Sequence, residues 1–355
     1  MRYFEKIKEL PLVDEPIIMA IETSCDETAV AIIKNGREIL ADEIISSATE
    51  HAKFGGVVPE IASRTHTTAI LTATERALKS ANLRLDDIDA FAVTEGAGLL
   101  GALLVGVSFA KSLAYSTGKP LVPVSHIRGH IAASYLADKT LEPPFITILA
   151  SGGHTAIVAV EDYYNLRVLG STIDDAVGEA FDKVARVLGL SYPGGPNVER
   201  LAQGGSNTVP LPKMLKNYDG GEYDFSYSGL KTAVINYVHN EESKGNSINK
   251  SDVAASFQHA AIDVLVEKAL KAADEFGYNT IAVSGGVGAN GYLRDALSEA
   301  TRGKGIKLIL PEKRYCTDNG AMIGAEGYLQ YKKRNFADLT LNAKAVIPLN
   351  VKQGD

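Results

Sequence analysis

The chain has 355 residues, of which 45% are hydrophobic and 22% charged, and its formal net charge is −7. This composition is typical of folded globular proteins and excludes disordered, collagenous and coiled-coil classes. The length predicts two domains, at roughly 100 to 200 residues each. The negative charge gives no general attraction for a polyanion, so any contact with nucleic acid needs a local basic patch.

The location of the protein is predicted from what the sequence lacks. Its longest apolar stretches are interrupted by glycine and fall short of the ~18 residues needed to cross a bilayer. The N-terminal residues mix charged and apolar types without the apolar core of a secretory signal. The two cysteines, Cys25 and Cys316, suit a reducing compartment. We therefore expect a cytoplasmic protein with no membrane contact.

The first predicted elements recur in the second half of the chain. Residues 17–33 and 145–160 each consist of an apolar run, a small polar turn ending in threonine and a second apolar run. This pattern predicts a β-hairpin. A third strand is expected after each hairpin, at 38–45 and 166–172. The sequence thus predicts the same three-stranded unit twice, as an internal repeat.

Helices and short buried strands are predicted after each hairpin. Apolar residues spaced by three and four predict helices at 66–81, 98–116, 175–188 and 253–276. Short apolar runs predict strands at 90–94, 121–124, 280–284 and 307–310.

This order predicts an α/β duplication with two lobes, each a mixed β-sheet flanked by helices, and an interlobe cleft that takes the ligand. We expect an N-terminal extension at 1–17, an N-terminal lobe at 18–140 and a C-terminal lobe at 141–317. The region 318–350 is expected to pack back on the N-terminal lobe. Residues 212–251, rich in charges, Asn and Gly, are expected to form a surface insertion.

Three polar turns follow predicted strands and offer groups that bind ligands. Residues 22–28 (ETSCDET) include Asp26 and Glu27, which could hold a cation or order a water. Residues 151–155 (SGGHT) and 284–290 (SGGVGAN) carry glycines, whose backbone N–H groups can approach a phosphate closely. One such turn is usually an ordinary connection, but three together favour nucleotide binding. Their spacing matches neither the dinucleotide fingerprint nor the P-loop, which disfavours hydride transfer.

A metal site is predicted from His126 and His130. Four residues apart at the start of a predicted helix, they share one face with Cβ atoms ~6 Å apart, from which two imidazoles can reach one ion. A bare pair of this kind is more often structural, and Asp318, the candidate third ligand, could instead cap the final helix. Two histidines and a carboxylate would leave positions open for substrate and would suit Zn²⁺ or Fe²⁺.

The histidine pair does not match a zinc protease. Ile127 and Arg128 follow His126, where the protease motif has its general base, a glutamate. The sequence also lacks the G-x-S-x-G turn of a serine hydrolase. Peptide hydrolysis is therefore disfavoured.

Seven blocks of the sequence resemble one known family. They are ETSCDET at 22–28, GGVVPE at 55–60, the pair His126 and His130, SGGHT at 151–155, GEAFDK at 178–183, YPGGP at 192–196 and CTDNG at 316–320. In this order they resemble the TsaD family, once called Gcp or YgjD, of tRNA N6-adenosine threonylcarbamoyltransferases. The resemblance extends over about residues 18 to 350, and residues 174–182 (DDAVGEAFD) resemble the bacterial branch.

The resemblance implies a fold and an activity. The fold would be that of actin, the heat-shock ATPases and the sugar kinases (the ASKHA fold). The activity would be transfer of threonylcarbamoyl from the co-substrate threonylcarbamoyl-AMP to N6 of the adenosine 3′ to the anticodon, in tRNAs that read ANN codons, with release of AMP. Two other functions stay open: a nucleotide phosphotransferase or ATPase of the same fold with Asp26 as base, and a nucleotide-responsive scaffold.

The resemblance also implies site residues at the matching positions. One divalent ion per chain, Fe²⁺ or Zn²⁺, would be held by His126, His130 and Asp318. The adenylate would contact Leu149, Ala150, Ser151, Gly152, Gly153, Asp182, Gly195 and Asn290, with Glu199 as a further ribose contact. We hypothesise that the metal binds the threonylcarbamoyl end, while Asp26 or Glu27 orients the exocyclic amine.

The partners implied by the resemblance are tRNA, a TsaB-like paralogue in a heterodimer and a TsaE-like ATPase. Basic residues that could contact tRNA are Lys313, Arg314, Lys332, Lys333 and Arg334. The chain departs from the family at residues 96–98, where Gly-Pro-Gly is usual, and at Arg128, where Glu or Ala is usual. We expect Arg128 to be solvated or to contact a phosphate.

Overall fold

The computed structural model describes residues 3–215 and 219–349. The chain divides into two compact units, which are described separately. The first unit comprises Met1–Leu141 and Thr317–Asp355, and the second comprises Glu142–Cys316. The predictions for residues 1–2, 216–218 and 350, within the extension, the insertion and the C-terminal region, lie outside the described residues.

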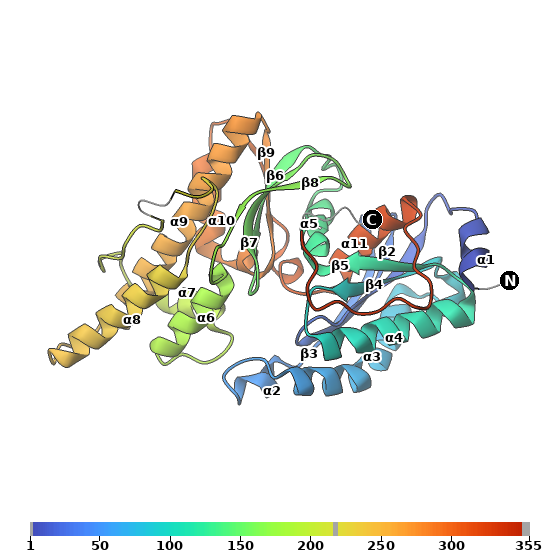
Figure 1. Cartoon of the computed structure of the whole chain (residues 1–355), viewed down its shortest axis with the longest axis horizontal. Coiled ribbons are helices and arrows are strands. Elements are labelled where there is room, and N and C mark those ends of the chain that lie inside the picture. The colour runs from blue at the N-terminus through green and yellow to red at the C-terminus, as the bar shows by residue number, and fades with distance from the viewer. Residues whose placement is uncertain (1–2, 216–218, 350–355) are drawn as a thin grey trace. The chain divides into compact units, whose positions relative to one another are not determined.

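The first unit contains a five-stranded mixed sheet in the order β3-β2-β1-β4-β5 (Figure 1). Its strands are β1 (Ile17–Glu22), β2 (Glu27–Lys34), β3 (Glu38–Ser46), β4 (Ala90–Gly96) and β5 (Leu121–Ser125). β1 pairs antiparallel with β2 and parallel with β4. Asn35 and Gly36 join β2 to β3 with φ values of 54° and 67°, a left-handed conformation that these two residue types tolerate best. The predicted hairpin and third strand are confirmed.

Helices cover both faces of this sheet. α3 (Pro59–Ala81) and α4 (Leu100–Thr117) share a core with Met19 and Ile21 of β1. α5 (His126–Ala137) and α11 (Gly320–Lys332) pack with Ile18 and Ala20, the residues of β1 that point to the opposite face. Two short helices, α2 (Ala48–Ala52) and η1 (Leu85–Asp87), complete the connections, and α1 (Tyr3–Glu9), within the predicted extension, buries Ile7 in the second of these cores.

Glycines let α11 lie directly on the sheet. A Cβ at Gly320 would stand 2.5 Å from the backbone nitrogen of Ala31, and a Cβ at Gly327 would stand 2.6 Å from the Cβ of Ala92. Both distances are shorter than real Cβ contacts, so any larger side chain would push the helix away from the strands. The start of α11, two residues after Asp318, is therefore fixed close to β2.

Within residues 3–215 and 219–349, one helix, α4, is long and apolar enough to cross a membrane by length and composition alone. This is weak evidence, because core helices of water-soluble domains pass the same test. In the first unit, Val107, Ala110 and Ala114 of α4 are fully buried in the core that α4 shares with β1. We interpret α4 as a packing helix of this unit.

The second unit repeats the sheet order of the first. Its five strands follow the order β10-β9-β6-β7-β8, with β6 (Phe145–Ala150), β7 (Thr155–Val160), β8 (Leu166–Ser171), β9 (Thr280–Ser284) and β10 (Lys307–Ile309). β6 pairs antiparallel with β7 and parallel with β9, as β1 does with β2 and β4. The predicted duplication is confirmed. The helices are α6 (Val177–Val187), α7 (Gly194–Ala202), α8 (Ser228–Ser243), α9 (Lys250–Phe276), η2 (Gly286–Ala289), α10 (Gly291–Thr301) and η3 (Lys313–Tyr315).

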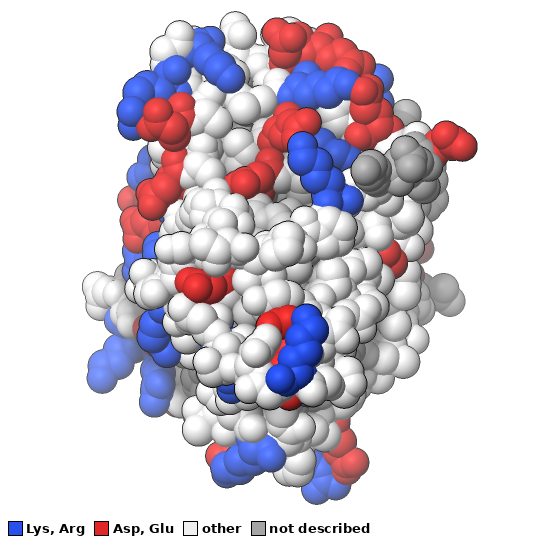
Figure 2. Space-filling model, turned by 90° about the vertical axis from the view of Figure 1, so that its left-hand side faces the viewer, with Lys and Arg blue, Asp and Glu red and all other residues white. Residues whose placement is uncertain are grey.

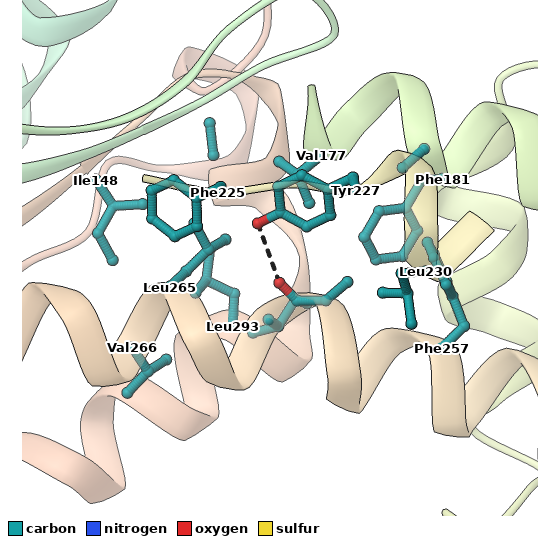
Figure 3. Close-up of a cluster of buried hydrophobic side chains, with 14 of the residues drawn as sticks. Ile148, Val177, Phe181, Phe225, Tyr227, Leu230, Phe257, Leu265, Val266 and Leu293 are labelled. Atoms are coloured by element: carbon teal, nitrogen blue, oxygen red, sulfur yellow. Dashed lines mark hydrogen bonds between the residues drawn. The ribbon is translucent and has the colours of Figure 1, made fainter. Parts of the chain in front are cut away.

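The core of the second unit includes part of the segment expected at the surface. Phe225 and Tyr227 are fully buried, and Leu230 of α8 is almost so. Figure 3 shows these side chains among Phe181 and Phe257, with the Tyr227 hydroxyl donating a hydrogen bond to the backbone oxygen of Ala261 at 3.3 Å. The expectation of a surface insertion is therefore wrong for this stretch, because aromatic residues placed singly between polar ones supply core contacts without forming an apolar run.

Candidate functional site

The two candidate histidines lie side by side at the start of α5. This helix begins at once after β5, with Ser125 as the last strand residue, so both rings project from its first turns. The ring centroids of His126 and His130 are 4.6 Å apart. Their Nε2 atoms lie 3.5 and 3.2 Å from Oδ1 of Asp318, respectively. The structure therefore brings these three predicted side chains together.

Asp318 does not have the capping role that the sequence left open. The N-cap of α11 is the next residue, Asn319, whose Oδ1 accepts the backbone N–H of Met322 at 2.8 Å. The Asp318 carboxylate instead points to the histidines, with 20% of the side chain exposed. Its position is set by the close packing of Gly320 on β2.

The spacing of the three groups fits one divalent ion. Their ligand atoms all lie within 4.8 Å of one another. Ligands ~2.1 Å from a tetrahedral ion are separated from each other by ~3.4 Å, and the two distances to Asp318 are 3.5 and 3.2 Å. Two neutral imidazoles and a carboxylate are also donors that Zn²⁺ and Fe²⁺ accept. The side chains could therefore hold such an ion with little movement.

The electrostatics of this cluster favour positive charge. Burial lowers the pKa of His126, but the carboxylates of Asp318 and Glu22 outweigh burial and raise it to about 9. Burial likewise raises the pKa of Asp318, and the imidazoles of His126 and His130 outweigh that effect and lower it to about 2. Carboxylates thus stabilise a positive charge at the point where a cation would be bound.

Glu22, the last residue of β1, stands behind His126 and was not among the predicted site residues. Its Oε2 lies 3.0 Å from Nδ1 of His126 and accepts the hydroxyl of Thr94 at 2.6 Å. The side chain is fully buried. Sequence analysis placed Glu22 in a carboxylate-bearing turn but had no means of knowing which carboxylate faces inward. Glu22 could have been identified because it is a charged residue at the end of an otherwise apolar strand.

Asp26 and Glu27 lie at the start of β2, in the same unit as the histidines. Ser47 anchors this turn, because its backbone N–H and its hydroxyl both donate to the backbone oxygen of Asp26, at 2.9 and 2.8 Å. Burial, together with the nearby charges of Asp318 and Asp26, raises the pKa of Glu27 to about 9. Burial and the same two carboxylates also raise the pKa of the Cys25 thiol. The turn is thus electrostatically linked to Asp318.

The expectation that Arg128 is solvated or contacts a phosphate is wrong. Its side chain is 5% exposed, and its Nε donates to Oε1 of Glu326 in α11 at 2.9 Å. The sequence could not show this, because the partner is 198 residues away. The ion pair links the helix that carries both histidines to the helix that follows Asp318.

The glycine turns of the second unit lie close to one another. The turn after β6 is closed by two hydrogen bonds between Ser151 and His154. A Cβ at Gly285 would lie 2.5 Å from the backbone oxygen of Ala150, and one at Gly178 would lie 2.6 Å from that of Ser151. Gly152 and Gly153 are exposed, with open space where a side chain would be. The two exposed glycines therefore present free backbone beside α6, while Leu149 is buried at the end of β6.

The other predicted adenylate residues are placed by local hydrogen bonds. Oδ1 of Asp182 accepts the backbone N–H of Gly194 at 2.8 Å, and burial raises the pKa of this carboxyl. Gly195 has open space around its Cα. Oε1 of Glu199 accepts the backbone N–H of Gly291 at 2.9 Å.

Asn290 is more constrained than the sequence suggests. Its Oδ1 accepts the backbone N–H of Leu293 at 3.0 Å as the N-cap of α10, and its Nδ2 donates to Gln258 at 3.0 Å. Gln258, buried on α9, was not predicted. The amide oxygen of Asn290 is therefore engaged within the protein.

One face of the molecule carries a mixture of basic and acidic side chains. On the face drawn in Figure 2, Lys and Arg side chains lie among Asp and Glu side chains, and no broad basic area is visible on the described part of that face. In the first unit, Arg334 donates to the backbone oxygens of Lys8 and Leu10, at 3.3 and 3.1 Å, so its guanidinium holds the N-terminal segment. The tRNA contacts suggested from the sequence stay a prediction.

The comparisons with known proteins agree on one family. A family model described as tRNA N6-adenosine threonylcarbamoyltransferase (TsaD) matches residues 38–325. A Clostridium perfringens protein of that name is 51% identical over 332 residues, which cover 93% of this chain and 97% of the relative. One from Clostridium botulinum strain Kyoto is 50% identical over 339 residues, with coverage of 95% and 98%.

Solved structures show the fold. HypF in a phosphate- and nucleotide-bound form matches with a TM-score of 0.62 at 16% identity, over 92% of this chain and 48% of that chain. HypF of T. kodakarensis also has a TM-score of 0.62, at 17% identity, over 94% of this chain and 50% of that one. The chain thus spans about half of each HypF chain, and the expected ASKHA architecture is confirmed. From the family match and the two close relatives, the chain belongs to the TsaD family of tRNA N6-adenosine threonylcarbamoyltransferases.

Proposed function

We propose that this chain transfers the threonylcarbamoyl group of threonylcarbamoyl-AMP to N6 of the adenosine 3′ to the anticodon, in tRNAs that read ANN codons. The observation that carries the proposal is the meeting of His126, His130 and Asp318 within 4.8 Å, in a chain 51% identical over 93% of its length to a protein named for this reaction. The second unit adds the turn at Gly152 and Gly153, whose exposed backbone suits a nucleotide phosphate.

The reaction forms one bond and breaks one. The N6 nitrogen attacks the carbamoyl carbon, the bond from that carbon to the phosphate oxygen breaks, AMP leaves, and N6 loses one proton. Because AMP is already a good leaving group, the protein chiefly needs to position the reactants and stabilise developing charge. A divalent ion held by His126, His130 and Asp318 would supply Lewis-acid polarisation of the acyl group.

Asp26 and Glu27 are the candidates for orienting the amine and accepting its proton. Burial, the largest cause, and the charges of Asp318 and Asp26 raise the pKa of Glu27 to about 9, which favours the protonated carboxyl at neutral pH. Asp26 is then the better acceptor, and Glu27 becomes a second candidate when a cation beside Asp318 reduces the repulsion.

The second unit would hold the adenylate. Gly152 and Gly153 offer backbone N–H groups to the phosphate, and Gly195 lets the backbone approach the nucleoside. Asp182 would accept hydrogen bonds from ribose hydroxyls, with Glu199 as a further contact. The buried end of β6, at Leu149 and Ala150, supports the turn, and Asn290 would contribute its remaining N–H.

The reaction would take place in an assembly with two helper proteins. A TsaB-like paralogue would form a heterodimer with this chain, a TsaE-like ATPase would join them, and tRNA would bind to the assembly in the cytoplasm. The isolated chain is then expected to show little activity.

The test is reconstitution with synthesised threonylcarbamoyl-AMP, unmodified tRNA and both helper proteins. Mass spectrometry of the digested tRNA should show threonylcarbamoyladenosine only when this chain is present. ATP turnover without tRNA would instead support a phosphotransferase or ATPase. Nucleotide binding without any turnover in the full assembly would support a scaffold.

A further inference from the structure

Glu22 is a fully buried carboxylate whose two oxygens are both engaged inside the protein. Oε1 accepts the backbone N–H of Ser24, and Oε2 accepts the hydroxyl of Thr94 at 2.6 Å. Oε2 also lies 3.0 Å from Nδ1 of His126. A charge with no exposed surface is costly unless it is paired and hydrogen-bonded. A hydrogen on Nδ1 of His126 gives this carboxylate one more hydrogen bond.

From this contact we infer that Glu22 is a positioning residue that fixes the ring and the tautomer of His126. The inference rests on the proposed function, because it gives the ring a task at the proposed metal site. With Nδ1 donating its hydrogen to Glu22, the lone pair of a neutral ring is on Nε2. Nε2 is the atom that faces Asp318 at 3.5 Å. A carboxylate behind a ligating histidine also makes the imidazole a stronger donor to the metal.

The backbone holds Glu22 in place. β1 and β4 are parallel, with Ile21 opposite Val93, so Glu22 and Thr94, the next residues along, lie side by side. The Thr94 hydroxyl has a single hydrogen and gives it to Glu22, which leaves Oε2 turned toward α5. β1 and β4 therefore set the orientation of the Glu22 carboxylate, and both strands precede α5 in the chain.

A second acceptor near the same ring nitrogen is the hydroxyl of Ser24, 3.1 Å from Nδ1 of His126. One N–H makes one good hydrogen bond, so the two oxygens compete for it. The carboxylate should win, because hydrogen bonds to ionised acceptors are roughly twice as strong as those between neutral groups. Ser24 then supports the carboxylate through its backbone N–H.

The two candidate ligands differ in this respect. Nδ1 of His130 is buried and has no hydrogen-bond partner among the described residues. Packing holds its helix instead, since a Cβ at the neighbouring Gly129 would lie 2.8 Å from Ile323 of α11. The His126 ring is thus oriented by the carboxylate of Glu22, whereas the His130 ring is held by the packing of its helix against α11. Only the His126 ring should respond to a change at Glu22.

The test compares metal binding by the full chain and by Glu22→Gln, with Co²⁺ and Zn²⁺ as probes. The variant keeps the size of the side chain but loses its charge. We expect its metal affinity to fall about 10- to 100-fold, the visible spectrum of bound Co²⁺ to change, and the ¹⁵N shifts of His126 to show a lost tautomer preference. Thr94→Val, which removes only the supporting hydroxyl, should cause a smaller loss and covers the case in which Glu22→Gln does not fold.

The matched control is Glu275→Gln, the same change at a carboxylate that accepts the Tyr223 hydroxyl in the second unit. It should leave metal affinity unchanged. If the wild-type chain bound no ion, the proposed function would fail at its metal site, and this inference with it. If the wild type bound one ion and Glu22→Gln bound it equally well, with the same ¹⁵N shifts of His126, the inference alone would be overturned.

Discussion

Arg128 of α5 and Glu326 of α11 form an ion pair that is almost completely buried, with 5% and 3% of their side chains exposed. Nε of Arg128 lies 2.9 Å from Oε1 of Glu326, which also accepts Nε2 of Gln330 at 2.6 Å. Such pairs cost desolvation energy and add little net stability. The role of this pair is geometric, because it ties the helix that carries His126 and His130 to the helix that directly follows Asp318.

Removing one member of the Arg128–Glu326 pair is expected to destabilise the protein strongly. Glu326→Leu leaves a buried guanidinium without its charge partner, so the free energy of unfolding should fall by about 3–5 kcal/mol, as measured by urea unfolding. The double variant Arg128→Met with Glu326→Leu should recover most of this loss. A single variant as stable as the wild type would contradict the buried pairing. Glu60→Gln, which breaks the exposed pair with Arg64, serves as control and should have almost no effect.

Replacing Asp318 should remove metal binding without unfolding the chain. The Asp318→Ala side chain offers no ligand atom, and two histidines alone hold an ion weakly. We expect metal analysis to find one ion in the wild type and almost none in the variant, with loss of transfer activity. The pKa of His126 should also fall, because the carboxylate that raises it most is gone. An active variant free of metal would refute the proposed role. Asp338→Asn, at a carboxylate that accepts bonds from Thr340, is the control.

Substitution of Gly195 tests the adenylate site without disturbing the fold. It is the second residue of α7 and has open space where a side chain would be, so Gly195→Ala should fold normally and melt at the same temperature or slightly higher. If the nucleoside lies against this backbone, the added methyl group should weaken AMP binding, as measured by calorimetry. Gly229→Ala, at the second residue of α8 and equally open, should bind AMP like the wild type. Equal affinity in both variants would place the nucleoside elsewhere.

The buried His66 should make folding stability depend on pH. Its Nδ1 lies 2.7 Å from the Thr28 hydroxyl and its Nε2 lies 2.9 Å from the backbone oxygen of Cys25. Burial lowers the pKa of His66 below its ordinary value of 6.5. The unfolded chain then binds the proton more readily, so the stability that depends on neutral His66 is present above pH 6.5 and is lost as the pH falls below that value.

This dependence is measured by urea unfolding at a series of pH values below and above 6.5. His66→Gln keeps a polar side chain that does not titrate. Its stability should therefore change less with pH than that of the wild type across this range. Identical pH profiles would mean that His66 is not kept neutral by folding.

The sequence predicted most elements of both units because their signals are local. The hairpin of β1 and β2 is encoded in two apolar runs and the polar turn between them, and α5 was expected because it follows the predicted strand at 121–124. The residues whose burial was predicted wrongly have contact partners that are far away in the sequence. Arg128 is buried only because Glu326 faces it, and Phe225 joins a core built largely from other segments.

Spacing alone predicted that His126 and His130 share a helix face, and Asp318 was named as the candidate third ligand, but the sequence left open whether Asp318 binds metal or caps the final helix. Nothing local distinguishes Asp318 from Asn319, and the structure gives the capping role to the second of them. Glu22 was missed for the same reason, since its function is defined by contacts with Thr94 and His126 across the sheet. Local sequence patterns specify the helices and strands, whereas the contacts within a site arise from the pairing of strands and helices that are far apart in sequence.

The order of these segments along the chain has a consequence for synthesis on the ribosome. α11, whose glycines seat it against β2 and β4, is translated after the whole of the second unit. Nascent chains that have already exposed His126 and His130 therefore still lack Asp318 and the helix that covers one face of their sheet. The first unit is started before the second and completed after it, and the candidate metal site can form only once Asp318 has been translated.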